Sequence, residues 1–100
     1  MNGPSTIHRY SIDLRGSASL NVKLPGHAQP LFLGRRPNDK HGQLSVWFQV
    51  PTAGPGGDAI TGPGRTFEIH GTGHDVPAGR DHVASVIDGM FVWHLFEVRP

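Results

Sequence analysis

The sequence predicts an all-β domain, a small antiparallel barrel or sandwich of about seven short strands. Apolar and polar residues alternate over short runs, Gly (14) and Pro (9) punctuate those runs, and no segment keeps a helical period. One hundred residues suffice for one core, so residues 1–100 are expected to form a single domain. Patterning does not separate a barrel from a sandwich.

Four strands are expected in the first half of the chain. The first two carry their apolar residues on alternate positions: Tyr10, Ile12 and Leu14 in residues 6–14, and Leu20, Val22 and Leu24 in residues 20–24. Residues 29–36 form the third candidate, with Leu31 and Leu33 opposite Phe32. The fourth, residues 43–50, has four apolar residues on one face and Trp47 on the other, so Trp47 needs a second surface to cover it.

Residues 51–64 consist mostly of Gly, Pro and small side chains. Such a segment has little to bury and cannot offset the entropy of ordering its backbone. We therefore expect a flexible Gly/Pro-rich loop at 51–64.

Three further strands are expected at residues 65–70, 82–87 and 90–98. Asp88-Gly89, between two apolar runs, is a strong signal for a hairpin. The last run is apolar on both faces, which places it in the middle of a sheet or against a partner subunit. Together with Trp47, this run favours a homo-oligomer, most simply a two-fold dimer.

The stretch from residue 65 to residue 77 contains the candidate site. A strand ends there in the turn Gly71-Thr72-Gly73-His74, with His70 before it. Glycine lets backbone N–H groups approach a ligand closely, while the hydroxyl and the imidazoles can hydrogen-bond to it. The alternative is that these glycines only supply the positive φ angles of a tight turn.

Composition excludes several classes of function. With 9 Lys and Arg against 8 Asp and Glu, the net charge of +1 provides no long-range attraction for a nucleic acid polymer or an anionic membrane. The chain has no cysteine, so disulfides and thiolate chemistry are absent. Neither a basic start followed by an apolar run nor a membrane-length apolar stretch occurs, which leads us to expect a cytosolic protein.

Neither metal nor catalytic residues are expected. His70, His74, His82 and His94 could converge, but close His pairs and the His-Glu-x-x-His motif are missing, so we expect no metal and no cofactor. No Gly-x-Ser-x-Gly elbow and no evident acid and base pair occur, so we expect no enzyme.

Aromatic and cationic residues suit binding better. Trp47 or Trp93 could stack on a flat ring, and Arg35, Arg36 or Arg65 could neutralise phosphates. Packing in the core is the alternative for both tryptophans.

Four segments together resemble a family of small tailed-phage proteins: Leu-Pro-Gly-His-Ala (24–28), Leu-Ser-Val-Trp-Phe-Gln-Val (44–50), Arg-Thr-Phe-Glu-Ile-His-Gly-Thr-Gly-His-Asp-Val-Pro (65–77) and Val-Trp-His-Leu-Phe-Glu (92–97). That family includes anti-CBASS sponges, which sequester cyclic dinucleotides such as cyclic GMP-AMP without hydrolysing them. The insert at 51–64 departs from the family's shorter loop.

The resemblance implies an anti-defence sponge that acts in the host cytoplasm and has a cyclic dinucleotide as its ligand. Its alternative is a structural or protein-binding phage accessory module acting through an oligomer interface. Side-chain chemistry at the matching motifs gives the candidate ligand-binding residues: Trp47, Arg65, His70, Gly71, Thr72, Gly73, His74 and His94.

Overall fold

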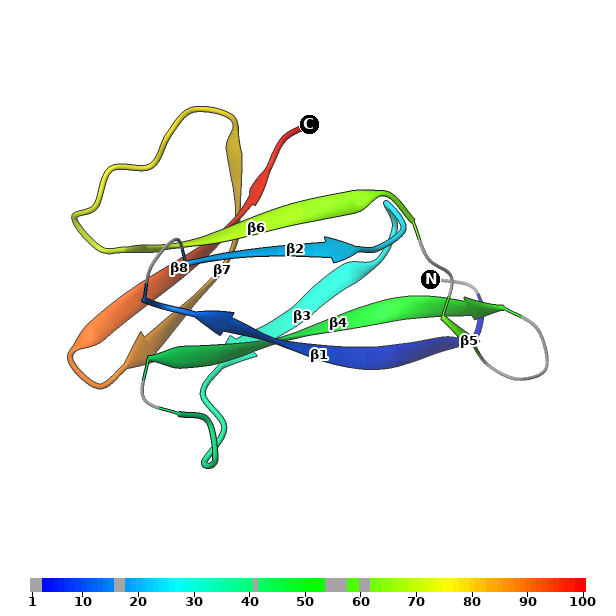
Figure 1. Cartoon of the computed structure of the whole chain (residues 1–100), viewed down its shortest axis with the longest axis horizontal. Coiled ribbons are helices and arrows are strands. Elements are labelled where there is room, and N and C mark those ends of the chain that lie inside the picture. Colours follow the sequence, from blue (N-terminus) through cyan, green and yellow to red (C-terminus); the bar gives the residue numbers. More distant parts are fainter. Residues whose placement is uncertain (1–2, 16–17, 41, 54–57, 60–61) are drawn as a thin grey trace.

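A computed structural model describes residues 3–15, 18–40, 42–53, 58–59 and 62–100. The described residues contain no helix and form two antiparallel sheets that face each other (Figure 1). The strands are β1 (Ser5–Asp13), β2 (Ser19–Lys23), β3 (Gln29–Gly34), β4 (Gln43–Ala53), β5 (Asp58–Ala59), β6 (Gly64–Gly71), β7 (Arg80–Asp88) and β8 (Phe91–Val98). The all-β prediction is confirmed, and the form is a sandwich rather than a closed barrel.

The first sheet has the order β1-β4-β3, and β5 pairs with the end of β4. Strand β4 lies in the middle because its apolar face carries Leu44, Val46 and Phe48, all fully buried. Its other face bears Trp47, which lies opposite Arg9 of β1 and Phe32 of β3.

The second sheet has the order β2-β6-β8-β7. Strand β8 therefore lies between β6 and β7. A position in the middle of a sheet is one of the two that the sequence predicts for this strand, because it is apolar on both faces. Its residue Leu95 is fully buried against the other sheet, while Phe96 on the opposite face is half-buried.

The core lies between the two sheets and receives residues from strands of both. Phe48 of β4 and Phe67 of β6 meet across it with ring centroids 5.1 Å apart. The buried apolar residues are Ile12, Val22, Leu24, Ala28, Leu33, Leu44, Val46, Phe48, Val50, Phe67, Ile69 and Leu95.

The third strand differs from the prediction in register and length. The pairing of β3 with β4 shifts between Pro30 and Phe32, and β3 ends at Gly34. This irregularity breaks the alternation, so Leu31 is 47% exposed while Leu33 is buried. Phe32 packs its ring 5.5 Å from that of Trp47 and supplies part of the cover that Trp47 needs.

The predicted flexible loop at 51–64 is partly strand. Strand β4 continues to Ala53, and Asp58–Ala59 pairs with Thr52 and Ala53. The rest of that prediction, at 54–57 and 60–61, lies outside the described residues.

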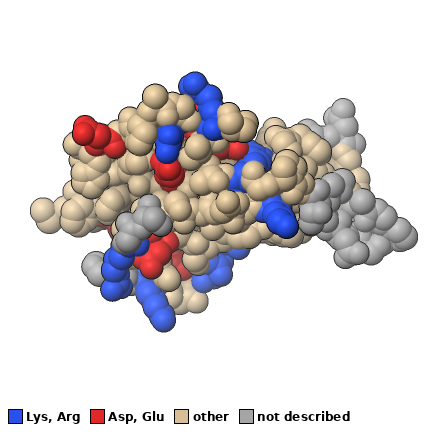
Figure 2. All heavy atoms as spheres, turned by 45° about the horizontal axis from the view of Figure 1, so that its top comes forward, with Lys and Arg blue, Asp and Glu red and all other residues tan. Residues whose placement is uncertain are grey.

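The predicted hairpin at Asp88-Gly89 is confirmed. Asp88 pairs with Phe91, and Gly89 takes the left-handed conformation with φ of +59° in the two-residue loop between them. Acidic and basic side chains are mixed on the face shown in Figure 2, in keeping with the small net charge. No helix in the described part is long and apolar enough to cross a membrane.

Candidate functional site

Of the two glycines in the turn after β6, only Gly73 takes the positive φ angle that a tight turn requires. Gly73 has φ of +89°, a conformation that other residues rarely adopt, and a Cβ there would meet nothing within 4 Å. A Cβ on Gly71 would lie 3.1 Å from the His74 ring and 3.3 Å from Trp93. Gly71 thus lets two rings approach the backbone closely.

A hollow of about 230 Å³ lies beside this turn. Phe91 and Trp93 of β8 form an aromatic pair on it, with ring centroids 5.7 Å apart and planes inclined by only 24°. Phe91 is 61% exposed, so part of this pair is open to solvent. The lining residues are Gly71, Thr72, His74, Met90, Phe91, Val92 and Trp93.

A second hollow, of about 220 Å³, has the same aromatic pair in its wall. Here the polar groups are Arg35, which follows β3, and Asp88 at the end of β7. Arg35 donates two hydrogen bonds to the Asp88 carboxylate, at 3.0 and 2.7 Å, and Asp88 raises the pKa of Arg35 through them. Trp93 Nε1 also donates to Asp88, at 3.4 Å. An aromatic surface therefore adjoins a fixed ion pair.

A hydrogen-bonded chain crosses the outer face of the second sheet and ends at the turn. His82 Nε2 and Ser85 Oγ lie 2.8 Å apart, Ser85 Oγ and His94 Nδ1 2.7 Å, and His94 Nε2 and Thr72 Oγ1 2.9 Å. Thr72 Oγ1 donates to the Val92 carbonyl at 3.4 Å.

One assignment of protons satisfies every member of this chain. Because each hydroxyl has a single proton, Thr72 accepts from His94 Nε2–H when it donates to the Val92 carbonyl. His94 Nδ1 then accepts from Ser85, and Ser85 accepts from His82 Nε2–H. This series of hydrogen bonds fixes the orientation of Thr72 at the rim of the first hollow.

The predicted site residues fall into several places. Gly71, Thr72 and His74 line the first hollow, and Gly73 is at the tip of the turn. His94 reaches this group through Thr72.

His70 lies on the outer face of the second sheet, where its Nε2 is 2.9 Å from Oε1 of Glu68. Arg80 donates two hydrogen bonds to the same carboxylate, and these bonds are the main reason that the pKa of Glu68 falls to about 2. His70 is thereby part of an ion-pair cluster rather than of the hollow.

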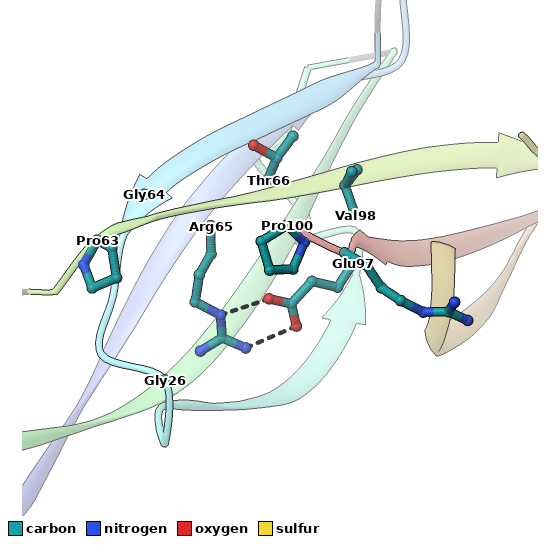
Figure 3. A pocket seen from close by; sticks show the side chains of 9 residues that line it. Gly26, Pro63, Gly64, Arg65, Thr66, Glu97, Val98 and Pro100 are labelled. Carbon is teal, nitrogen blue, oxygen red and sulfur yellow. Dashed lines mark hydrogen bonds and ion pairs between the residues drawn. The ribbon is translucent and has the colours of Figure 1, made fainter. Parts of the chain in front are cut away.

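Arg65 lies at the other end of β6, in the wall of a third hollow, of about 460 Å³ (Figure 3). Its guanidinium donates to both oxygens of Glu97, at 2.7 and 2.9 Å, and to the carbonyls of Pro25 and Ala28. This side chain holds the Pro25–Ala28 turn against the sheet.

Trp47 is on the outer face of the first sheet, beside Phe32. The structure therefore does not bring Trp47 and Arg65 together with the Gly71–His74 turn.

The sequence pattern does not predict that Phe91, Asp88 or the His82–Ser85 contact belongs to the site. The Asp-Gly hairpin signal was the available clue, since a two-residue loop after Asp88 pairs it with Phe91. Within the described residues, no group of three or more His, Asp or Glu side chains is arranged to hold a metal ion.

Comparison with known families matches residues 4–100 to a domain of unknown function (DUF7352). The chain belongs to the DUF7352 family. No curated protein and no solved structure matches it.

Proposed function

We propose that this DUF7352 protein binds a cyclic dinucleotide at the Phe91–Trp93 pair and sequesters it without hydrolysis, as a phage-type sponge does in the host cytoplasm. The observation that carries the proposal is that one aromatic pair lines two hollows. The sequence resemblance to phage sponges supplies the class of ligand.

The size of the hollows supports a ligand with two ring systems. Each hollow, at about 230 or 220 Å³, is below the roughly 300–1,000 Å³ that encloses a drug-sized molecule. Each can take one ring, and a cyclic dinucleotide offers two bases joined by phosphates. Stacking of a base on an aromatic side chain contributes about 1–3 kcal/mol.

The polar groups suit the remainder of such a ligand. Thr72 and His74 offer a hydroxyl and an imidazole at the first hollow, where Gly71 lets the Trp93 ring lie close to the backbone. Arg35 stands at the second hollow with its side chain 26% exposed, which leaves a cation within reach of a phosphate.

The test is isothermal titration calorimetry with cyclic GMP-AMP, cyclic di-AMP and cyclic di-GMP. Phe91→Ala should weaken binding by about 1–3 kcal/mol, the contribution of one stacked base. Ile87→Ala is the matched control, because Ile87 is also exposed on the same hairpin but lines neither hollow. Chromatography of the released ligand should recover it intact.

Absence of binding for all three ligands would contradict the proposal. It would favour the alternative of a protein-binding accessory module, for which the exposed apolar tip of the β7–β8 hairpin is the specific support. Ile87, Met90 and Phe91 there are 77%, 97% and 61% exposed.

A further inference from the structure

Strand β1 presents an open edge of backbone hydrogen-bonding groups. The Leu14 N–H donates to the Gly42 carbonyl, and the Thr52 N–H donates to the Pro4 carbonyl. The backbone N–H and C=O groups of successive residues in an antiparallel strand point to opposite edges. Those of the even-numbered residues of β1 therefore point toward β4, and those of the odd-numbered residues point away from it. The outward residues are Ser5, Ile7, Arg9, Ser11 and Asp13.

The edges of β3, β7 and β2 are less suited to pairing. β3 contains Pro30 and an irregular register, β7 has a register shift between His82 and Ala84, and β2 is only 5 residues long. Bulges, prolines and short strands are the features by which proteins prevent edge pairing. β1 has 9 residues in continuous register with β4, without a bulge or a proline.

We infer that β1 is a homodimer interface, where β1 of a second copy adds antiparallel to the first and joins the two sheets across a two-fold axis. The alternating outward N–H and carbonyl groups of this edge are self-complementary in that arrangement.

Charge selects the register. An axis at Ser11 pairs Arg9 with Asp13 of the partner subunit, which places opposite charges directly across from each other, twice. An axis at Arg9 would instead oppose two like charges. An axis at Tyr10 would place Arg9 opposite a serine. The axis at Ser11 is therefore the one that the sequence of β1 favours.

The first test is sedimentation velocity over a series of protein concentrations. Wild type should reach twice the 10.8 kDa mass of one chain. Ser11→Pro should remain monomeric, because it removes an outward N–H while leaving every β1–β4 hydrogen bond. Asn21→Pro is the matched control on the edge of β2. The Ile69 N–H donates to the Ala18 carbonyl, so the even-numbered residues of β2 bond to β6 and the N–H of residue 21 points away from β6.

The second test fixes the register by oxidation. The natural chain has no cysteine, so Ser11→Cys introduces a single thiol. At a hydrogen-bonded pair on the axis the Cα atoms lie about 5.5 Å apart, within disulfide range. Ser11→Cys should therefore cross-link into a covalent dimer, and Ser19→Cys, exposed on the β2 edge, should not. A monomeric wild type, a dimeric Ser11→Pro variant, or equal cross-linking of the two cysteine variants would overturn the inference.

Discussion

Gly71 and Gly73 have different roles in one turn. Gly73 is required by its backbone angle, and Gly71 is required by the closeness of the His74 and Trp93 rings. The purely conformational explanation therefore applies to Gly73 alone. Gly71 is where the absence of a side chain shapes the hollow.

The conformational cost at Gly73 can be measured. Gly73→Ala should lower the free energy of unfolding by about 1–2 kcal/mol, since an L-residue in the left-handed region is strained by that amount. Gly26→Ala serves as the control, because a Cβ there also meets nothing within 4 Å and its φ is not positive. Equal stability of the two variants in urea denaturation would contradict this assignment.

Glu68 should make stability depend on acid. Its pKa is about 2 in the folded protein against an ordinary value of 4.5, because Arg80 and His70 hydrogen-bond to the ionised form. A lowered pKa means that the stabilisation is complete above pH 4.5 and is lost as the pH falls toward 2. Glu68→Gln should remove that part of the pH dependence.

Thermal unfolding of wild type and Glu68→Gln between pH 2 and pH 5.5 tests this, because the range runs from the pKa of Glu68 in the folded protein to above its ordinary value. The midpoints of the two proteins should converge as the pH falls. If the midpoints of the two proteins instead changed in parallel over the whole pH range, the Glu68–Arg80 pair would not be the source of the acid dependence.

At the scale of elements, Arg65 connects β6 to parts of the chain distant in sequence. It joins the Pro25–Ala28 turn to Glu97 of β8 with its side chain only 14% exposed. Arg65→Ala should therefore lower the free energy of unfolding by about 1.5–3 kcal/mol, the range for hydrogen bonds to charged groups. Arg99→Ala, which removes an exposed pair with Asp81, should leave the free energy of unfolding almost unchanged, because solvent screens such a pair.

Urea denaturation of both variants checks these values, and calorimetry shows whether ligand binding survives. Arg65→Ala should keep its affinity, because Arg65 lies in a different hollow from Phe91. Salt-dependent loss of affinity with little loss of stability would instead restore Arg65 to the site, as the sequence suggested.

Alternation of apolar residues is sufficient to predict where every described strand but β5 lies, because burial of one face is a local property of the sequence. It could not predict which strands lie side by side, so the distance between Trp47 and the Gly71–His74 turn was not foreseeable. The irregular register at Leu31 was also hidden, since residues 29–34 read as a regular strand.

On the scale of the whole molecule, the proposed ligand site lies where the β7–β8 hairpin and the turn after β6 meet, at one end of the sandwich (Figure 1). The third hollow, beside Arg65, is lined instead by the start of β6 and by residues 97–100. The chemistry of the Gly71–His74 turn is readable from the sequence. The nearness of Phe91 and Asp88 to this turn is not, because it depends on the order of the strands: β8 pairs with both β6 and β7.

The most direct test of the proposed site is a two-dimensional ¹H–¹⁵N NMR titration that follows the two tryptophan indole N–H signals. Trp93 lines both hollows, whereas Trp47 lies on the outer face of the other sheet. The Trp47 signal is therefore an internal control in the same sample. Addition of cyclic GMP-AMP should shift the Trp93 signal and leave that of Trp47 in place. A shift of the Trp47 signal alone, or of neither signal, would contradict a ligand site at the Phe91–Trp93 pair.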